Sequence, residues 1–147
     1  MSGRKRHLLV DTGGLVLRVL VHPANISDRD GARLLLADVP VRWPSLRRLW
    51  VDAGYTGRLL DWVRETLGLE VEVVKRPRPG TKVAATAEPP PRPAAFPILP
   101  RRWVVERTFG WLGRNRRLSK DYEQLSATEE AWVYLAMSRL MLRRLAR

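Results

Sequence analysis

The sequence contains no cysteine, and its only histidines are His7 and His22. The lack of cysteine excludes disulfide bonds, zinc–thiolate sites and thiol nucleophiles. Two isolated histidines offer little material for a histidine metal site or for Ser-His-Asp catalysis. Long uncharged apolar runs are missing too, because no segment approaches the roughly 20 residues that a membrane-spanning helix needs. The basic start of the chain has no apolar stretch behind it, so we do not expect a secretory signal.

Acidic residues are scarce relative to basic ones. The 147 residues include 27 Lys and Arg but only 15 Asp and Glu, which gives a formal net charge of +12. A surplus of this size in one domain-sized chain indicates a polyanionic partner, either nucleic acid or an anionic membrane surface. The hydrophobic fraction of 45% is sufficient for a packed core. The composition therefore predicts a folded cytoplasmic protein with a polyanionic partner.

The apolar pattern predicts an α/β domain with a mixed sheet flanked by helices. Adjacent glycines at 13 and 14 indicate a hairpin between the first two strands, and Ser126 with Glu129 forms a capping-box pattern before the last helix. A stretch at about 77–100 holds eight of the 11 prolines and reads as a loop or linker. The predicted strands lie at 7–10, 15–21, 46–52 and 69–74, and the predicted helices lie at 28–38, 59–67, 101–118 and 128–147.

Asp52 closes a predicted strand and precedes a loop that contains Gly54 and Gly57. Strand ends in α/β sheets are where ligand-binding groups collect, which makes Asp52 a candidate site residue. The alternative is an ordinary solvated or turn aspartate at the end of a strand.

Glu106 lies on a predicted helix whose one face also carries Arg102, Gly110, Gly113 and Arg117. A carboxylate beside glycines and arginines suits the close approach of a phosphate backbone. The alternative is an amphipathic helix in which Arg102 and Glu106 form an ordinary ion pair. Each glycine in a helix interior costs about 1 kcal/mol, which favours a functional reason for the pattern.

Five further residues favour structural roles. Asp11 sits at the hairpin and reads as a turn-forming aspartate. Asp28 and Asp30 read as helix-start residues near the positive end of the helix dipole. His7 and His22 are lone strand residues without a partner pattern, so we expect both to be structural.

The basic surplus gathers in several arginine-rich clusters. Such clusters match phosphates, although a charged helix face is also compatible with simple solvation. The predicted DNA-binding residues are Arg4, Lys5, Arg6, Arg101, Arg107, Arg114, Arg116, Arg117 and Lys120.

Two segments, 49–57 around Asp52 and 99–112 around Glu106, strongly resemble bacterial insertion-sequence transposases of the DDE type. The segments 3–12, 28–32 and 116–123 match the same family, and the similarity covers almost the whole chain except the proline-rich stretch.

The resemblance implies an RNase H-like fold in which three carboxylates hold two Mg²⁺ ions for DNA strand cleavage and transfer. Asp52 matches the second aspartate and Glu106 the glutamate, so both are expected to be catalytic metal ligands. Arg102 matches the arginine four residues before that glutamate and is expected to position a phosphate or a carboxylate. Leu99 stands where related groups often have tyrosine, and Gly113 stands where they often have lysine.

No residue matches the first catalytic aspartate, which in the family lies on a strand upstream of the segment resembling 3–7. The resemblance therefore implies that residues 1–147 form part of the catalytic domain, lacking the first strand. We expect a truncated or split transposase; the alternative is a non-catalytic DNA-binding remnant that occupies transposon ends or modulates full-length transposase. A basic RNA-binding protein is a third hypothesis, but no RNA-binding module signature is visible.

The expected partners are transposon-end and target DNA, together with a second copy of the chain or an upstream transposase fragment, and no membrane. The expected location is the bacterial cytoplasm, at the nucleoid when the protein is bound to DNA. Whether the chain is an active enzyme stays open at this point.

Overall fold

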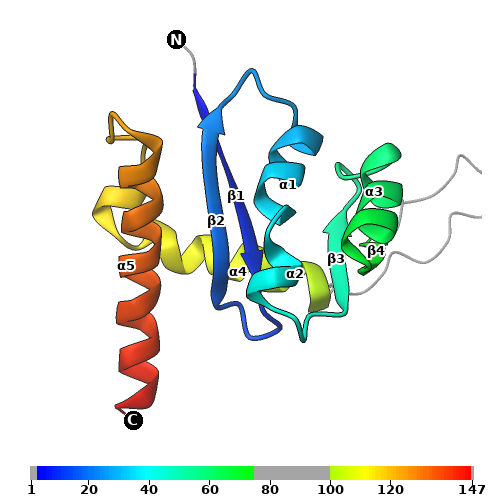
Figure 1. The fold of residues 1–147 in the computed structure, drawn as a ribbon. Helices are drawn as coiled ribbons and strands as arrows, with labels where there is room; N and C mark the ends of the chain where they lie inside the picture. Colours follow the sequence, from blue (N-terminus) through cyan, green and yellow to red (C-terminus); the bar gives the residue numbers. More distant parts are fainter. Residues whose placement is uncertain (1–2, 75–99, 147) are drawn as a thin grey trace, which may run out of the picture.

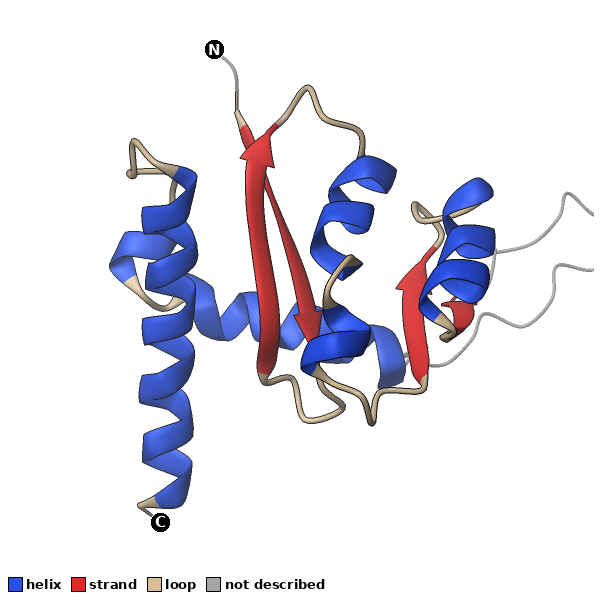
Figure 2. Ribbon diagram, in the orientation of Figure 1, coloured by secondary structure: helices blue, strands red, loops and turns tan. Residues whose placement is uncertain are grey.

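The computed structural model describes residues 3–74 and 100–146, and only the backbone of residues 100–102. Figures 1 and 2 show short strands alternating with helices, and the long last helix stands at one end of the molecule. The proline-rich stretch predicted at about 77–100 lies almost entirely outside the described residues. The elements are β1 Arg4–Val10, β2 Val16–Pro23, α1 Asp28–Leu36, α2 Val39–Arg42, β3 Arg48–Asp52, α3 Arg58–Leu67, β4 Glu70–Val74, α4 Pro100–Gly113, the 3₁₀ turn η1 Arg116–Leu118 and α5 Ser126–Leu145.

The strands form two separate pairs. β1 runs antiparallel to β2, with His7 opposite Leu20, and β3 runs parallel to β4, with Arg48 opposite Glu70. The predicted α/β class is confirmed, but the described strands make two two-stranded sheets and not one mixed sheet. In Figure 1 the arrows of β1 and β3 point in opposite directions. The sheets stay separate because no described strand lies between β1 and β3 to hydrogen-bond with both.

The hairpin between β1 and β2 turns at the predicted glycines. Gly14 has a φ of 83°, a left-handed conformation that glycine adopts readily. Asp11 Oδ1 accepts the backbone N–H groups of Gly13 and Leu15, each at 2.8 Å. The predicted turn role of Asp11 is therefore confirmed.

Helices cover both faces of the β1–β2 sheet. On one face, Leu9 of β1 joins a core that also contains α1, α2, β3 and α3, including Leu36 and Val63. On the other face, Val21 of β2 packs with Leu112 of α4 and Val133 of α5. β2 is nearly all apolar because both of its faces are buried.

The helix predicted at 28–38 ends early, at Leu36. Ser27 caps its start, because Ser27 Oγ accepts the N–H of Asp30 at 3.2 Å and donates to Asp30 Oδ2 at 2.6 Å. Pro40 lies four residues beyond Leu36, where its ring clashes with a continuing helix, and it instead lies in the first turn of α2. The helix-start role predicted for Asp30 is confirmed.

The helix predicted at 101–118 also ends early, at Gly113. Asn115 terminates it by donating from Nδ2 to the carbonyls of Trp111, at 3.2 Å, and Leu112, at 3.1 Å. These bonds satisfy acceptors that a continuing helix would otherwise use. The residues that follow, Arg116–Leu118, form a 3₁₀ turn.

The capping box predicted for α5 is wrong. Ser126 is the first helical residue, and Leu125 takes the N-cap position without a side-chain hydrogen bond. Glu129 does not reach back to the cap because its buried carboxylate pairs with Arg6 of β1. Neither α5 nor any other helix in the described part of the chain combines the length and apolar character that crossing a membrane requires.

Candidate active site

Asp52 is the exposed last residue of β3. Its Oδ1 accepts the backbone N–H of Gly54 at 2.8 Å, and its carbonyl accepts the N–H of Tyr55 at 3.1 Å. This is the hydrogen-bonding pattern of an aspartate turn, which fixes the carboxylate to its own loop. Within the described residues Oδ2 makes no hydrogen bond, so the turn is compatible with a ligand at that oxygen.

Tyr55 joins the loop after Asp52 to the first sheet. Its phenol oxygen lies 2.8 Å from Nδ1 of His7 on β1. The ring of His7 stacks on that of His22 from β2, with centroids 4.8 Å apart and an interplanar angle of 19°. Both imidazoles are buried, with exposed fractions of 6% and 4%. These contacts connect β2, β1 and the loop of the candidate carboxylate.

Gly31 of α1 faces this histidine pair. A Cβ at Gly31 would lie 2.7 Å from Nε2 of His7 and closer still to Nε2 of His22. His22 Nδ1 donates to the carbonyl of Pro23 at 2.8 Å, whereas neither Nε2 atom finds a partner among the described residues. The two imidazoles thus occupy the space that a side chain at position 31 would need.

Burial shifts the pKa values of Tyr55 and His7. Burial, together with the negative charges of Asp52 and Asp28, raises the pKa of Tyr55 to about 12. Burial also lowers the pKa of His7, and positive charge on His22 lowers it further. At neutral pH both groups are neutral, so His7 and Tyr55 serve as a positioning link for the Asp52 loop.

Glu106 lies on α4, and the two residues after it fix this helix to the β1–β2 turn. Arg107 donates to the carbonyl of Gly13 at 2.9 Å, and Thr108 Oγ1 donates to that of Gly14 at 2.7 Å. Thr108 is completely buried. α4 also contacts both β1 and β3. The elements that carry the two predicted carboxylates are therefore in contact.

The face of α4 that carries Glu106 is exposed. Glu106 is exposed, and a Cβ at Gly110 or Gly113 would meet no described atom within 4 Å. The glycines therefore leave free surface beside the carboxylate, as the sequence pattern predicted. The side chains of Arg101 and Arg102, which were predicted to bind DNA and to assist catalysis, lie outside the described residues.

The described residues contain no group of three or more His, Asp or Glu side chains that could hold a metal ion together. Asp11 and Asp30 are engaged in the hairpin turn and the α1 cap. Asp52 and Glu106 are both exposed, and their carboxylate oxygens are the hard donors that Mg²⁺ prefers.

Comparison with known proteins identifies the family. A family model of the transposase DDE domain matches residues 1–141. The chain belongs to the DDE transposase family. It is 26% identical over 141 residues to a protein of Burkholderia cepacia named as the transposase for insertion sequence element IS402, an alignment that covers 90% of this chain and 60% of that relative. This DDE transposase chain thus spans less than two thirds of that relative's length, and no solved structure matches it.

Three of the basic residues predicted to bind DNA have partners inside the transposase chain. Arg4 pairs with Asp121 at 2.6 Å, Lys5 pairs with Asp28 at 2.9 Å, and Arg6 pairs with Glu129. These ion pairs tie β1 to the start of α1 and to the region around the start of α5. Their charge is therefore largely compensated within the fold.

The remaining described candidates lie on or after α4. Arg107 bonds to the hairpin turn and stacks 4.8 Å from the Trp111 ring. Arg117 pairs with Glu123 at 3.2 Å. The side chains of Arg114, Arg116 and Lys120 are exposed, with no ion pair among the described residues.

Sequence reasoning missed the connection between His7, His22 and Tyr55. A register signal was available: in the hairpin, His7 lies opposite Leu20 and His22 opposite Lys5, so the two histidines sit on one sheet face as diagonal neighbours. Nothing in the sequence pattern indicated that Tyr55 would reach them.

Proposed function

We propose that this transposase chain takes part in metal-dependent cleavage and transfer of DNA strands, with Asp52 and Glu106 as two of the metal-binding carboxylates. The observation that carries the proposal is the contact between α4, which bears Glu106, and β3, which ends at Asp52. Membership of the DDE transposase family supports the same chemistry. We propose that Arg102, four residues before Glu106, positions a phosphate or a carboxylate.

Two Mg²⁺ ions fit the donor chemistry of this site, because Mg²⁺ is a hard cation that takes oxygen ligands. When bound, such a pair supplies an activated oxygen nucleophile and stabilises the leaving oxygen. The chain's own residues hold the carboxylates in place. The Gly54 N–H fixes one oxygen of Asp52, and the bond from Thr108 to the hairpin turn fixes the helix of Glu106.

We also propose that the site is completed by a further strand between β1 and β3, supplied by a segment outside these 147 residues. Within the described chain, β1 pairs only with β2 and β3 only with β4, so each has an unpaired edge. Because β1 and β3 run in opposite directions (Figure 2), one strand between them would pair parallel with one of the two and antiparallel with the other. The family resemblance implies that this strand brings the third carboxylate.

The direct test is plasmid nicking with Mg²⁺ or Mn²⁺. We expect little cleavage by the chain alone and metal-dependent nicking when the segment encoded directly upstream of Met1 is fused to it or added separately. In the completed protein, Asp52→Asn and Glu106→Gln should each abolish nicking, whereas Glu65→Gln, which removes an exposed carboxylate of α3, should not. Full nicking by the Asp52 and Glu106 variants would overturn the site assignment.

A second candidate function is a non-catalytic DNA-binding protein that occupies transposon ends or modulates full-length transposase. The observation that favours it is the lack of a three-ligand cluster among the described residues. Salt-sensitive DNA binding without nicking, even after the upstream segment is added, would support this function over the first. Under either function we propose DNA as the partner, with the bacterial cytoplasm and nucleoid as the location and with self-association or an upstream fragment as the route to assembly.

A further inference from the structure

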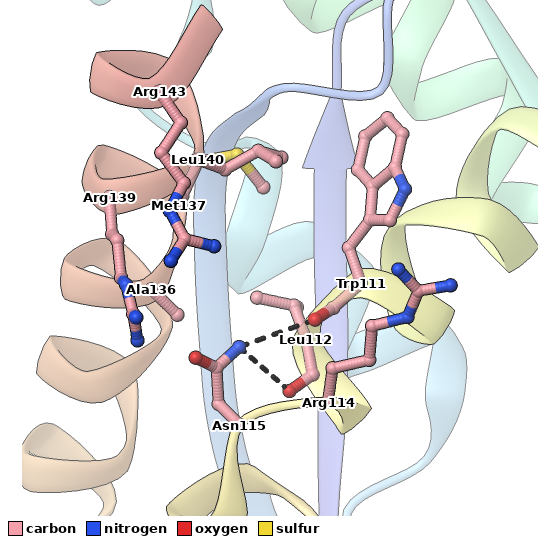
Figure 3. Close-up of a pocket in the computed structure, with 9 residues that line it drawn as sticks. All are labelled: Trp111, Leu112, Arg114, Asn115, Ala136, Met137, Arg139, Leu140 and Arg143. Atoms are coloured by element: carbon pink, nitrogen blue, oxygen red, sulfur yellow. Dashed lines mark hydrogen bonds between the residues drawn. The ribbon is translucent and has the colours of Figure 1, made fainter.

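A pocket of about 270 Å³ lies between the end of α4 and α5. Figure 3 shows Arg139 and Arg143 projecting from α5, Arg114 extending from the residue after α4, and Asn115 between the two helices. None of the described residues that line it is acidic. We call this cavity the arginine pocket.

The walls of the arginine pocket are fixed by packing. Leu112 and Met137 line it and are 1% and 3% exposed. Asn115 is held by its hydrogen bonds to the end of α4. The Trp111 ring, another part of the wall, contacts the guanidinium of Arg144 at 4.7 Å. The cavity is therefore a feature of the α4–α5 interface and not of a loose loop.

Among the described residues, the three arginines of the pocket have no counter-charge. Arg114, Arg139 and Arg143 make no hydrogen bond or ion pair within the described part of the chain, in contrast to Arg4 and Arg6, which pair with carboxylates. A guanidinium group does not lose its proton in a protein. Positive charges gathered without a partner repel one another, and a bound anion relieves that repulsion.

The size and donors of the pocket match a phosphate group. Guanidinium groups present planar N–H forks that fit phosphate oxygens. At about 270 Å³ the cavity falls just below the roughly 300–1,000 Å³ of small-molecule sites, so it suits one phosphate better than a whole cofactor. Arg107 and Arg144, which both stack against Trp111, extend the basic surface beyond the cavity. Successive phosphates of a DNA backbone would contact both the cavity and the basic surface around Trp111.

We propose that the arginine pocket binds the phosphodiester backbone of duplex DNA at a place separate from the candidate active site. Trp111 follows Glu106 by five residues, which turns it about 140° around α4. DNA bound in the arginine pocket would be held at phosphates away from the one that reacts. The pocket would therefore anchor a flanking segment of the DNA. This inference rests on the proposed function, because that function makes DNA the partner.

The test is duplex DNA binding by the full chain across a salt series, measured with EDTA so that metal chemistry plays no part. We expect Arg139→Gln/Arg143→Gln to weaken binding by about five- to tenfold per arginine at moderate salt and to reduce the salt slope by about 2. Arg114→Gln should reduce the slope by about 1. The matched control Arg29→Gln/Arg58→Gln removes two exposed arginines elsewhere and should leave both quantities nearly unchanged. Circular dichroism and melting curves verify that each variant is folded.

Two further arms identify the anion. Vesicles rich in phosphatidylserine should bind more weakly than DNA and should not distinguish the pocket variant from its control. Millimolar inorganic phosphate should compete little against DNA at constant ionic strength. Equal salt slopes for the pocket and control variants would overturn the proposal that the arginine pocket binds DNA. Preferential binding of vesicles or full competition by free phosphate would overturn it as well. Because nicking is not measured here, a failure of strand cleavage is a separate result.

Discussion

The imidazole Nδ1 of His7 and the phenol oxygen of Tyr55 lie 2.8 Å apart, although 48 positions separate the two residues in the chain. This contact joins the first sheet to the loop of Asp52, which closes the second sheet. It is a polar link between two sheets that share no strand within the described residues. The position of the candidate carboxylate therefore depends on a histidine of the neighbouring sheet.

Tyr55→Phe removes this link without changing the ring. We expect the free energy of unfolding to fall by about 1–2 kcal/mol, because the buried Nδ1 of His7 loses its partner. Urea denaturation measures the change. Tyr122→Phe, at an exposed tyrosine, is the control and should stay within about 0.5 kcal/mol of the wild type. Equal stabilities for the two variants would show that the His7–Tyr55 contact does not hold the sheets together.

We expect alanine substitution to have opposite effects on stability at Gly31 and at Gly110. Gly31→Ala places a Cβ against the imidazoles of His7 and His22, which must move, and we expect a loss of about 1–3 kcal/mol. Gly110→Ala adds a Cβ in open space on a helix and should stabilise the chain by about 0.5–1 kcal/mol through helix propensity. Thermal melting of both variants decides the matter. A stabilising Gly31→Ala would show that the histidine rings are not fixed against α1.

Stability should fall in mild acid because the pKa of His7 is lowered in the folded state, mainly by burial. The unfolded chain then binds a proton more readily than the folded one, so folding weakens as pH drops below the ordinary value of 6.5. Lys5 and Asp28 are the nearby charges, and the lowered pKa of Asp28 acts only below its ordinary value of 3.8. Urea denaturation from pH 7.5 to pH 4.5 should show the loss, and it should be smaller in His7→Gln. Parallel pH profiles for the two proteins would contradict this origin.

Thr108→Val keeps the shape of a completely buried side chain but removes its bond to the Gly14 carbonyl. We expect a loss of about 1–3 kcal/mol, because the turn carbonyl loses a buried partner. In the completed transposase, nicking should fall more than stability explains, since the same bond positions the helix of Glu106. Thr128→Val, on a partly exposed threonine of α5, is the matched control. Nicking at the wild-type rate by folded Thr108→Val would show that α4 is held by other contacts.

Local elements followed from the sequence because their causes are local. The glycine pair and Asp11 specify the hairpin turn, Ser27 specifies the start of α1, and Gly68, with a φ of 64°, ends α3. The early ends of α1 and α4 have local causes too, in Pro40 and Asn115, whereas the predicted cap of α5 was overturned by a distant partner. Glu129 leaves its predicted cap for Arg6, which is 123 positions away in the chain.

For the candidate site too, some features followed from the sequence and others only from the tertiary structure. Motifs around Asp52 and Glu106 identified the family and marked these two carboxylates as candidates, because spacing and residue type are properties of the sequence alone. The tertiary structure decided which arginines are paired internally and which are unpaired, since an ion pair such as Arg4–Asp121 forms only when β1 meets the segment before α5. It also decided that Tyr55 meets His7, and that Arg114 and Arg143 line one pocket between α4 and α5. Contacts of this kind depend on how helices and sheets pack, and no pattern within either segment encodes the identity of its distant partner.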